Sequence, residues 1–356
     1  MKIAIIGGGI NGIMTAWELC KHHHDVTLFE KNTLMSQTSS ASSKLLHGGL
    51  RYLENFEFRL VKEALRERQW WINQAPDLAQ PLQIFIPIYK QSRRPAWLYK
   101  IGLYLYDLFS GKQNIGKHKN HSKVSMQRFC SELKMNSLIK GFSYYDGQMD
   151  DYQLGIWAAN QAKQYENLTI LENTIIDRVD INGEVAYDSN KEQFDKVINI
   201  TGPWASQLLK DNNIDSDYEL DLVRGSHIVV DRKLDHGYLL EVPSERRIFF
   251  VLPYQGQTLI GTTEVRQKIS DKIECTKSEV TQLINSFNYY FVNRITERDV
   301  VKSFAGVRPL IKSSNDINKI TREYAVQTNI NLISVFGGKW TTARQLAKKV
   351  VKMIEC

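Results

Sequence analysis

The chain opens with KIAIIGGGING, Lys2 to Gly12, and this stretch decides the fold. Its first part, Lys2 to Ile6, is a short apolar run with β-branched residues, which predicts a strand. Gly7, Gly9 and Gly12 follow in the spacing GxGxxG. In that spacing the first glycine makes a tight turn, the second lets the backbone approach a pyrophosphate, and the third allows close helix packing. The opening therefore predicts a dinucleotide-binding turn.

The residues after the turn complete a βαβ unit. Ile13 to Lys21 predicts a helix, and Val26 to Glu30 predicts a second strand. The helix N-terminus would offer unpaired N–H groups and the positive end of its dipole to phosphates. Glu30, at the end of the second strand, can accept hydrogen bonds from ribose hydroxyls and would repel a 2′-phosphate. NADP is therefore disfavoured, while FAD and NAD both stay open on these residues.

Composition limits the class of protein. With 356 residues, 42% of them hydrophobic, the chain can bury a large core and exceeds the ~100–200 residues of an ordinary single domain. The formal net charge of +7 favours anionic partners, which include phosphorylated metabolites, anionic lipid head groups and nucleic acid. Charge alone does not choose among these. No nucleic-acid-binding motif accompanies the charge, so we expect no nucleic-acid partner.

The cysteine pattern and the hydropathy indicate a cytoplasmic protein. Cys20, Cys130, Cys275 and Cys356 lie far apart without a CxxC pair, so we expect neither a disulfide framework nor a metal site. His22 to His24 predict a turn. No stretch reaches the ~18–20 apolar residues of a membrane span, and the short apolar start is not a secretory signal. We expect a cytoplasmic location, with peripheral contact to the cytoplasmic membrane face left open.

Four later segments carry further structural predictions. Thr38 to Ser43 is rich in hydroxyls and indicates a functional loop, and Phe56 to Ile72 has a helical pattern. Gly111 to Ser125 lacks periodicity and suggests an exposed excursion. Asn331 to Phe336 predicts a strand that meets a glycine pair and then a helix of good helix formers.

The hydroxyl-rich loop begins a longer stretch, TSSASSKLLHGGLRYLE, Thr38 to Glu54. This stretch resembles the FAD-dependent, respiratory-type glycerol-3-phosphate dehydrogenases, which belong to the D-amino-acid-oxidase-like flavoproteins. Further signatures similar to that family follow in order: RPAWLYKIGLYLYD (Arg94 to Asp107), DGQMDDYQL (Asp146 to Leu154), TGPW (Thr201 to Trp204), RGSHIVV (Arg224 to Val230), LPYQGQTLIGTTE (Leu252 to Glu264), AGVRPL (Ala305 to Leu310) and FGGKWTT (Phe336 to Thr342). The resemblance spans nearly the whole chain.

Two features depart from the family pattern. Gln37 stands where the family commonly has a glycine, which predicts a slightly different loop path beside the flavin. The sequence ends at Cys356, soon after the helix that follows FGGKWTT, where bacterial members usually continue into a helical C-terminal domain. The resemblance is thus to a short form that lacks this domain, and we expect the catalytic parts to be present in it.

The resemblance implies an α/β fold. A Rossmann-like FAD-binding domain of the glutathione-reductase type would carry an inserted α+β substrate domain with a mixed sheet. The FAD-binding domain is expected to be discontinuous, over residues 1–78, 146–208 and 300–356. The substrate-binding domain is expected over residues 79–145 and 209–299.

FAD is the cofactor that the resemblance implies. The residues expected to bind it are Gly7, Gly9, Gly12, Glu30, Lys31, Ser39, Ser40, Ser42, Ser43, His47, Gly48, Gly49, Thr201, Gly202, Gly338, Lys339 and Thr341. The serine-rich segment would donate hydrogen bonds to pyrophosphate and ribityl oxygens, or else form a surface turn. The glycine pair before Lys339 would place a helix N-terminus near the flavin pyrimidine edge. It also suits an ordinary strand-to-helix turn with a threonine cap.

The resemblance also implies a substrate site. The expected substrate-binding residues are Arg51, Tyr52, Thr262, Arg308 and Arg322, and the expected catalytic residues are His227, Arg308, Lys339, Arg51 and Tyr52. Arginine suits a phosphate because its planar fork can donate two parallel hydrogen bonds. His227 is the candidate general base, because imidazole titrates near neutral pH. The alternatives are ordinary ones: solvated arginines, a core tyrosine and a structural histidine on a strand.

Together these expectations describe oxidation of sn-glycerol 3-phosphate to dihydroxyacetone phosphate, with hydride transfer to flavin N5 and electrons passed to a quinone or another acceptor. The implied substrate is a small phosphorylated polyol. Two alternatives stay open: an FAD enzyme for another hydroxy acid, amino acid or polyol phosphate, and a catalytically silent flavin-binding protein. The aromatic run from Trp97 to Phe109 either packs on the fold as an amphipathic helix or rests in a membrane interface.

Overall fold

The computed structural model describes residues 1–243, 245–312 and 324–355. Its strands are β1 (Lys2–Ile6), β2 (Asp25–Phe29), β3 (Leu45–Leu46), β4 (Ala79–Tyr89), β5 (Lys119–Ser122), β6 (Leu138–Met149), β7 (Leu168–Leu171), β8 (Ile176–Val179), β9 (Glu184–Tyr187), β10 (Asn190–Gln193), β11 (Lys196–Asn199), β12 (Leu220–Val230), β13 (Gly237–Glu241), β14 (Ile248–Tyr254), β15 (Gln257–Gly261), β16 (Val265–Arg266), β17 (Val300–Ile311), β18 (Tyr324–Asn329) and β19 (Leu332–Gly337). Its α-helices are α1 (Ile10–Lys21), α2 (Phe58–Gln74), α3 (Ala96–Ser110), α4 (Lys123–Phe129), α5 (Asp151–Ala162), α6 (Ala205–Asp211), α7 (Lys277–Tyr290) and α8 (Ala343–Glu355). Short 3-10 helices are η1 (Thr38–Ser40), η2 (Leu50–Asn55), η3 (Gly111–Gln113), η4 (Gly202–Trp204) and η5 (Glu297–Asp299). Within the described ranges, none of the helices has the length and apolar character needed to cross a membrane.

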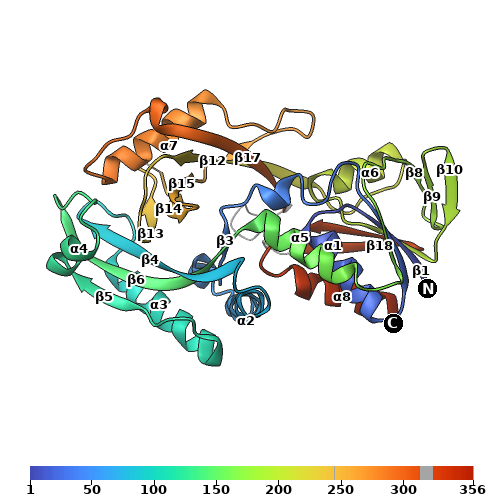
Figure 1. The fold of residues 1–356 in the computed structure, drawn as a ribbon, viewed down its shortest axis with the longest axis horizontal. Coiled ribbons are helices and arrows are strands. Elements are labelled where there is room, and N and C mark those ends of the chain that lie inside the picture. The colour runs from blue at the N-terminus through green and yellow to red at the C-terminus, as the bar shows by residue number, and fades with distance from the viewer. Residues whose placement is uncertain (244, 313–323, 356) are drawn as a thin grey trace.

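The opening strand lies inside a six-stranded sheet (Figure 1). The strand order is β18-β19-β11-β1-β2-β7, in which β18 is antiparallel to β19 and the other pairings are parallel. Successive side chains of β1 point to opposite faces. Ile3 and Ile5 enter the core on one face, whereas Ala4 and Ile6 enter the core on the other. The predicted strand from Lys2 to Ile6 is confirmed, and the glycine turn follows its carboxyl end.

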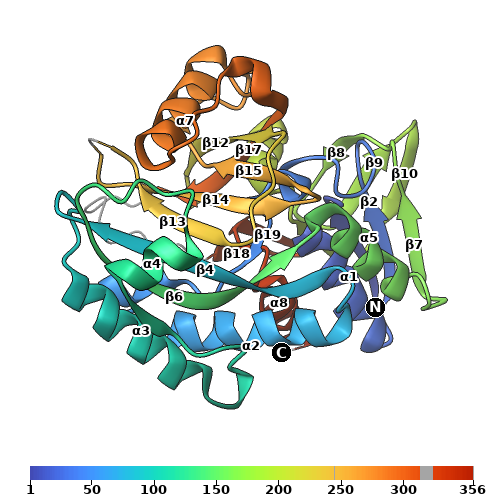
Figure 2. The ribbon, with the colours of Figure 1, turned by 60° about the vertical axis from the view of Figure 1, so that its left-hand side comes forward.

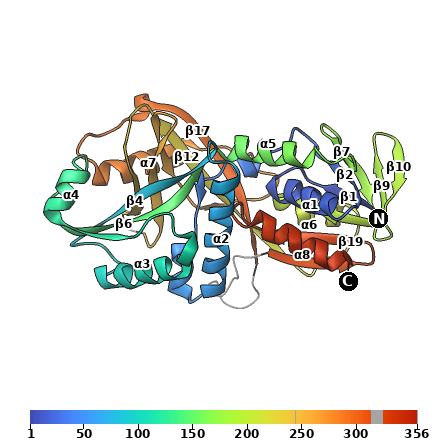
Figure 3. The same cartoon turned by 60° about the horizontal axis from the view of Figure 1, so that its bottom comes forward.

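Helices cover one face of this sheet and a small sheet covers the other. Helix α1 packs between α5 and α8 (Figure 3). Ile13 of α1, Leu154 of α5 and Leu346 of α8 share one apolar core. On the opposite face, Val179 and Val185 of the three-stranded sheet β10-β9-β8 join the core that includes β1. Both faces of β1 are therefore buried, which explains its almost uninterrupted apolar sequence.

The other half of the molecule is a ten-stranded mixed sheet with the path β16-β12-β15-β14-β13-β4-β6-β3. Strand β17 pairs with β12, and β5 pairs with β6. Helix α7 covers one face, and α2 and α3 lie on the other (Figure 2). Phe287 of α7 packs in one core with Phe249, while Leu65 of α2 and Leu103 of α3 pack in another with Ile84. The expected α/β architecture with a second mixed sheet is confirmed.

One local feature differs from the sequence expectations, and one strand bears on the expected domain boundary, which remains a prediction. The segment from Gly111 to Ser125 is not a plain excursion, because Lys119–Ser122 forms β5 and pairs with β6. The side chain of His121, in β5, is buried and forms a hydrogen bond with the Ser143 hydroxyl. Strand β17 pairs along its length with β12, so it extends the larger sheet although residues 300–311 were expected in the FAD-binding domain. The four residues of β5 are too short a pattern for periodicity in the sequence to reveal that strand.

Candidate active site

A cavity of about 1030 Å³ lies at the carboxyl edge of the six-stranded sheet. Its lining includes residues that follow each of the parallel strands: Gly7 after β1, Glu30 after β2, Thr174 after β7, Thr201 after β11 and Gly338 after β19. Open α/β sheets bind their ligands at this edge, where the chain turns to opposite sides of a central strand. The volume is at the upper limit of the ~300–1,000 Å³ of small-molecule pockets, which suits a dinucleotide together with a substrate.

Most of the predicted residues meet in this cavity. The predicted residues in its lining are Gly7, Gly9, Glu30, Lys31, Ser39, Ser42, Ser43, His47, Gly49, Tyr52, Thr201, Gly202, His227, Thr262, Arg308, Gly338, Lys339 and Thr341. Gly12, Ser40 and Gly48 lie outside the lining. Arg322 falls outside the described residues, and of Arg51 only the backbone, in η2, is described.

The glycine turn is close-packed. Gly7 has a φ of +121°, and a Cβ added to it would lie 2.7 Å from the carbonyl oxygen of Ile200. A Cβ on Gly12 would lie 1.9 Å from the carbonyl oxygen of Gly7. The Gly8 N–H donates to a Glu30 carboxylate oxygen at 2.7 Å, which fixes the turn against the end of β2. Gly12 therefore acts by letting α1 approach the turn, and not by lining the cavity.

Two segments that are distant in the sequence converge at the N-terminus of α1. The Ser39 hydroxyl accepts a hydrogen bond from the Ile10 N–H at 3.0 Å, and the Trp340 indole N–H donates to the Ser39 carbonyl at 3.0 Å. A Cβ on Gly338 would lie 2.7 Å from the side-chain nitrogen of Asn11. The side-chain oxygen of Asn11 is buried and has no hydrogen-bond partner among the described residues. A helix N-terminus bordered by glycines and a serine loop suits the pyrophosphate of a dinucleotide.

A buried ion pair holds the hydroxyl-rich loop from Thr38 to Ser43, which we call the serine loop. The Lys44 ammonium donates to Asp151 at 2.5 Å and to the Ser40 carbonyl at 2.7 Å. The Ser42 hydroxyl donates to the second oxygen of Asp151 at 2.7 Å. The Ser40 hydroxyl instead donates to the carbonyl of Gln37 at 3.0 Å. Ser40 thus shapes the loop, while Ser42 reaches the cavity.

The glycine pair after His47 serves two different contacts. The Gly48 N–H donates to the Tyr106 hydroxyl at 2.8 Å and to Asp146 at 3.1 Å. A Cβ on Gly48 would lie 2.3 Å from the same hydroxyl oxygen. Gly49 has a φ of +75°, and a Cβ there would lie 2.0 Å from the Tyr52 ring. Gly48 therefore packs against α3 and β6 of the larger sheet, and Gly49 makes room for the ring of Tyr52.

His227 lies on β12 and is buried although it borders the cavity. Its Nε2 is 2.9 Å from the Ser43 hydroxyl, and its ring stacks on Phe304 at a centroid distance of 5.0 Å. The Nδ1 atom is buried and makes no hydrogen bond to the described part of the chain. Burial, and then the charges of Arg308 and Lys44, lower the pKa of His227 to about 3. The imidazole is therefore neutral at physiological pH, and its Nε2 is the ring nitrogen that lies beside a cavity-lining residue, Ser43.

Arg308 extends from β17 across the neighbouring strand. One of its terminal nitrogens donates to the Thr263 carbonyl at 3.1 Å, and the other lies 3.6 Å from Glu264. The Thr262 hydroxyl donates to the same carbonyl at 3.1 Å. A Cβ on Gly225 would lie 2.4 Å from that hydroxyl oxygen and 3.1 Å from the guanidinium. Gly225 thus leaves the space through which Arg308 and Thr262 come together.

Lys339 and Tyr52 form a second group. The Lys339 ammonium lies 4.2 Å from the centre of the Tyr52 ring, a cation–π contact. The His47 ring lies 6.3 Å from the Tyr52 ring. A small pocket beside the main cavity is lined by these three residues and by Thr341. Elsewhere in the lining of the main cavity, the Lys31 ammonium lies 4.0 Å from the Trp204 ring.

Two carboxylates were missed from the sequence. Asp146 accepts hydrogen bonds from Gly48, Arg68 and Tyr106, and Asp151 pairs with Lys44. Both belong to DGQMDDYQL, so a signal was present in a segment that already resembled the family. A carboxylate in isolation predicts a solvated surface group, because charged side chains are seldom fully buried without a partner.

The fold and cavity define a dinucleotide-dependent oxidoreductase, and comparison with known proteins identifies the class. Residues 2–353 match the family described as FAD-dependent oxidoreductase, DAO. The chain belongs to this family and is an FAD-dependent oxidoreductase. The residues present fit that cofactor: a glycine turn at a helix N-terminus, a carboxylate after the second strand and a cavity large enough for the dinucleotide.

Within the family, the resemblance to glycerol-3-phosphate dehydrogenases is confirmed. The glycerol-3-phosphate dehydrogenase of Pseudomonas tolaasii is 35% identical over 99% of this chain and 71% of its own length. The D-erythritol 1-phosphate dehydrogenase of Brucella abortus is 34% identical over 97% of this chain and 72% of its own length. The structure of the glycerol-3-phosphate dehydrogenase from Bacillus halodurans complexed with FAD superposes with a TM-score of 0.78 at 24% identity. The match covers 99% of this chain and 64% of that one, and it supports the fold.

Proposed function

We propose that this protein oxidises sn-glycerol 3-phosphate to dihydroxyacetone phosphate. One observation carries the proposal: Arg308 and Lys339 line the same cavity as His227 and the FAD-binding turns. Bound FAD supplies the hydride acceptor. The two cations suit a substrate that carries a phosphate, and the histidine suits a group that receives the proton of a hydroxyl. The activity of the P. tolaasii relative, as its name gives it, agrees with this assignment.

We assign the phosphate to Arg308, with Arg51, Arg322, Lys339 and Tyr52 as further substrate ligands. The Arg308 guanidinium borders the cavity and is held on one side by the Thr263 carbonyl. A guanidinium suits a phosphate because it presents its N–H donors in a rigid planar fork. Its side chain is 39% exposed, which permits a ligand to reach it.

We assign proton removal from the substrate hydroxyl to His227. Nε2 lies 2.9 Å from the hydroxyl of Ser43, which also lines the cavity, whereas Nδ1 is buried, so Nε2 is the atom that would accept the proton. The nearby charges of Arg308 and Lys44 contribute to the low pKa of the imidazole. A phosphate dianion bound to Arg308 would offset one of these charges and raise the pKa of His227 in the complex. Substrate binding would in this way prepare the base.

A second polyol phosphate, D-erythritol 1-phosphate, is the main alternative substrate. The D-erythritol 1-phosphate dehydrogenase of B. abortus is as similar to the chain as the glycerol-3-phosphate dehydrogenases are, at 34% against 35% identity. Both compounds present a phosphate and a hydroxyl, and the cations described above do not distinguish between them. The choice depends on the residues that contact the rest of the polyol.

The deciding experiment is an anaerobic titration of the FAD-loaded protein. Loss of the visible absorbance of the oxidised flavin is expected with sn-glycerol 3-phosphate and not with glycerol, which lacks the phosphate. D-erythritol 1-phosphate and an α-hydroxy acid complete the series. Faster bleaching by D-erythritol 1-phosphate would transfer the assignment to that substrate. An unchanged spectrum with every compound would indicate a flavin-binding protein without this activity.

We further propose a quinone acceptor and peripheral contact with the cytoplasmic face of a membrane. The outer face of α3 exposes Trp97, Ile101, Tyr104 and Leu108, which recur at helical spacing. The opposite face of α3, which carries Leu103 and Tyr106, is buried on the larger sheet. An exposed apolar stripe on a well-packed helix suits an interfacial membrane contact. In this proposal one face of α3 packs on the fold and the other contacts the membrane, so both interpretations of the aromatic run from Trp97 to Phe109 apply.

Vesicle flotation tests the membrane proposal. The protein is expected to float with vesicles that contain anionic lipid, and replacement of Trp97 and Tyr104 by serine should abolish this. Val124 and Phe129 on α4 are also exposed apolar residues, so their replacement by serine is the matched control. Equal loss of flotation in both variants would refute a specific role for α3.

A further inference from the structure

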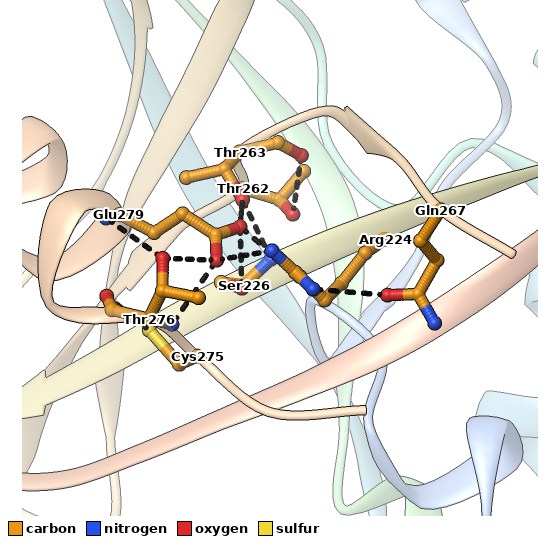
Figure 4. Close-up of polar contacts among 8 residues, drawn as sticks. All are labelled: Arg224, Ser226, Thr262, Thr263, Gln267, Cys275, Thr276 and Glu279. Atoms are coloured by element: carbon orange, nitrogen blue, oxygen red, sulfur yellow. Dashed lines mark hydrogen bonds and ion pairs between the residues drawn. The ribbon is translucent and has the colours of Figure 1, made fainter. Parts of the chain in front are cut away.

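Helix α7 places a buried carboxylate, Glu279, in a polar network with Thr263, the residue that follows the cavity-lining Thr262 (Figure 4). Glu279, in the first turn of α7, is 3% exposed. Its carboxylate accepts hydrogen bonds from the hydroxyls of Thr263 (2.7 Å), Ser226 (2.8 Å) and Thr276 (2.8 Å), the Thr276 N–H (3.1 Å) and the Arg224 guanidinium (2.9 Å). These partners are all groups of the protein, and Glu279 does not line the cavity.

The two oxygens of Glu279 have separate tasks. Oε2 receives both Thr276 bonds and closes the capping box at the start of α7. Oε1 receives the hydroxyls of Thr263 and Ser226, which helix capping does not require. Burial alone would raise the pKa of Glu279, but hydrogen bonds from Thr263, Thr276 and Ser226 lower it to about 2. The group stays a carboxylate at every pH at which the enzyme would work.

Thr263 connects this carboxylate to Arg308. Its hydroxyl donates to Glu279 and accepts the Ser226 N–H at 2.9 Å. Its carbonyl, on the other side of the same residue, accepts from Arg308 at 3.1 Å and from the Thr262 hydroxyl at 3.1 Å. Thr263 is 1% exposed and does not line the cavity, whereas Thr262 and Arg308 do. The side chain of Thr263 thus anchors a backbone group that holds the guanidinium.

A competing contact shows why an anchor is useful. Glu264 lies 3.6 Å from the second terminal nitrogen of Arg308 and also borders the cavity. If the Thr263 carbonyl moved, this carboxylate would be free to draw the guanidinium away from the ligand. A displacement of about 1 Å in a positioning group is enough to cost a large factor in rate or binding.

We propose that Glu279 is a positioning residue, which acts through the Thr263 hydroxyl to hold Arg308 where it binds the phosphate of the substrate. This inference rests on the proposed function. It assigns no chemistry to Glu279, which contacts neither substrate nor flavin. It does assign a measurable role in phosphate affinity to a residue that lies behind the sheet.

Thr263→Val tests the connection, because valine keeps the shape of threonine and removes its hydroxyl. In the FAD-loaded protein we expect about tenfold weaker binding of inorganic phosphate, a KM for sn-glycerol 3-phosphate raised by a similar factor, and a smaller change in kcat. Thr263→Ser restores the hydroxyl and should recover most of the affinity. Thr281→Val is the matched control, since Thr281 is an exposed residue of α7 whose hydroxyl bonds only its own helix.

A double-mutant cycle separates positioning from general stability. In an Arg308→Ala background, Thr263→Val should weaken phosphate binding no further, because the group that it positions is gone. Equal effects of Thr263→Val in both backgrounds, or no effect in either, would overturn the inference. Glu279→Gln provides a second route if the valine variant does not fold, and it should show the same dependence on Arg308.

The readouts keep the two proposals apart. If sn-glycerol 3-phosphate fails to reduce the flavin of the unaltered protein, the proposed function fails, and the inorganic phosphate titrations still report on the link between Thr263 and Arg308. If the substrate does reduce the flavin but phosphate affinity is the same in Thr263→Val, the positioning role fails and the function stands.

Discussion

The side of the cavity that we propose for FAD is made from backbone turns at the ends of adjacent parallel strands, whereas the side that we propose for the substrate is made from side chains on strands that pair over long distances. Gly7 and Gly338 belong to the first kind, and each follows a strand directly. His227 and Arg308 belong to the second, on β12 and β17. We therefore expect steric fit to dominate on the cofactor side and charge placement on the substrate side. Substitutions should therefore fail in different ways on the two sides.

The largest effect is expected from Gly12→Ala, which tests steric fit on the cofactor side. The new Cβ would lie 1.9 Å from the Gly7 carbonyl oxygen, so either α1 or the glycine turn must move. We expect loss of most bound FAD and destabilisation of several kcal/mol. Flavin absorbance of the purified protein and its thermal unfolding measure both.

Gly102→Ala is the matched control for this substitution. Gly102 lies inside α3, and the nearest atom to a Cβ there is 3.9 Å away. The same change should keep FAD and raise stability by about 0.5–1 kcal/mol, because alanine favours a helix. Retention of full FAD content in Gly12→Ala would show that the turn tolerates displacement, and the steric view of the cofactor side would be wrong.

His227→Gln should have the next largest effect, and it should act on catalysis. Loss of a general base lowers kcat by about 10²–10⁴-fold, while FAD content should stay unchanged. Rapid-reaction measurement of flavin reduction gives the rate. If the flavin of the variant is reduced as fast as that of the unaltered protein, His227 is not the general base.

The pH dependence gives an independent check on His227. Its pKa is about 3 in the folded protein, below the ~6.5 of an unfolded chain, so only the unfolded state takes up this proton between these values. The contribution of His227 to the free energy of unfolding is therefore at its maximum above pH ~6.5, and it falls by about 1.4 kcal/mol per pH unit below that pH. Urea unfolding at pH 7 and pH 5 should show a larger loss for the unaltered protein than for His227→Gln. Equal losses would contradict the neutral, buried imidazole.

Arg308→Ala should act mainly on substrate affinity. Removal of a charge-assisted contact to phosphate is expected to lower kcat/KM by about 100-fold, chiefly through KM. Arg266 supplies the comparison, since it borders the same cavity but is 69% exposed and pairs with Asp221 at 2.9 Å. Arg266→Ala should change kcat/KM by less than about threefold. Similar losses in both variants would mean that the cavity attracts phosphate by overall charge and not through one placed arginine.

The contrast between the two sides also explains what the sequence could predict. The strand from Lys2 to Ile6 and the turn at Gly7 depend on neighbouring residues, and both were located from the sequence alone. The resemblance supplied Arg308 and His227 as candidates. It could not supply their contacts, because the pairing of Arg308 with Val223 depends on the register of β17 against β12.

Buried polar networks were the hardest to foresee. Lys44 and Asp151 are far apart in the sequence, and nothing local distinguishes them from solvated charges. The same holds for Glu279, whose capping box with Thr276 is a local signal, but whose bond to Thr263 requires the tertiary fold. The division of the chain into FAD-binding and substrate-binding domains remains a prediction, and the pairing of β17 suggests a boundary after residue 311.

The smallest effect is expected from Glu30→Gln, which asks whether charge matters on the cofactor side at all. Glu30 accepts the Gly8 N–H at 2.7 Å and the Asn32 N–H at 2.9 Å, and we expect it also to accept ribose hydroxyls of FAD. An amide can replace only one of these acceptor oxygens, so FAD affinity should fall by about tenfold. Glu172→Gln is the matched control, because Glu172 also accepts a backbone N–H, that of Leu34 at 2.6 Å, but does not line the cavity. Calorimetric titration of the FAD-free protein compares the two, and equal affinities would restrict Glu30 to holding the turn.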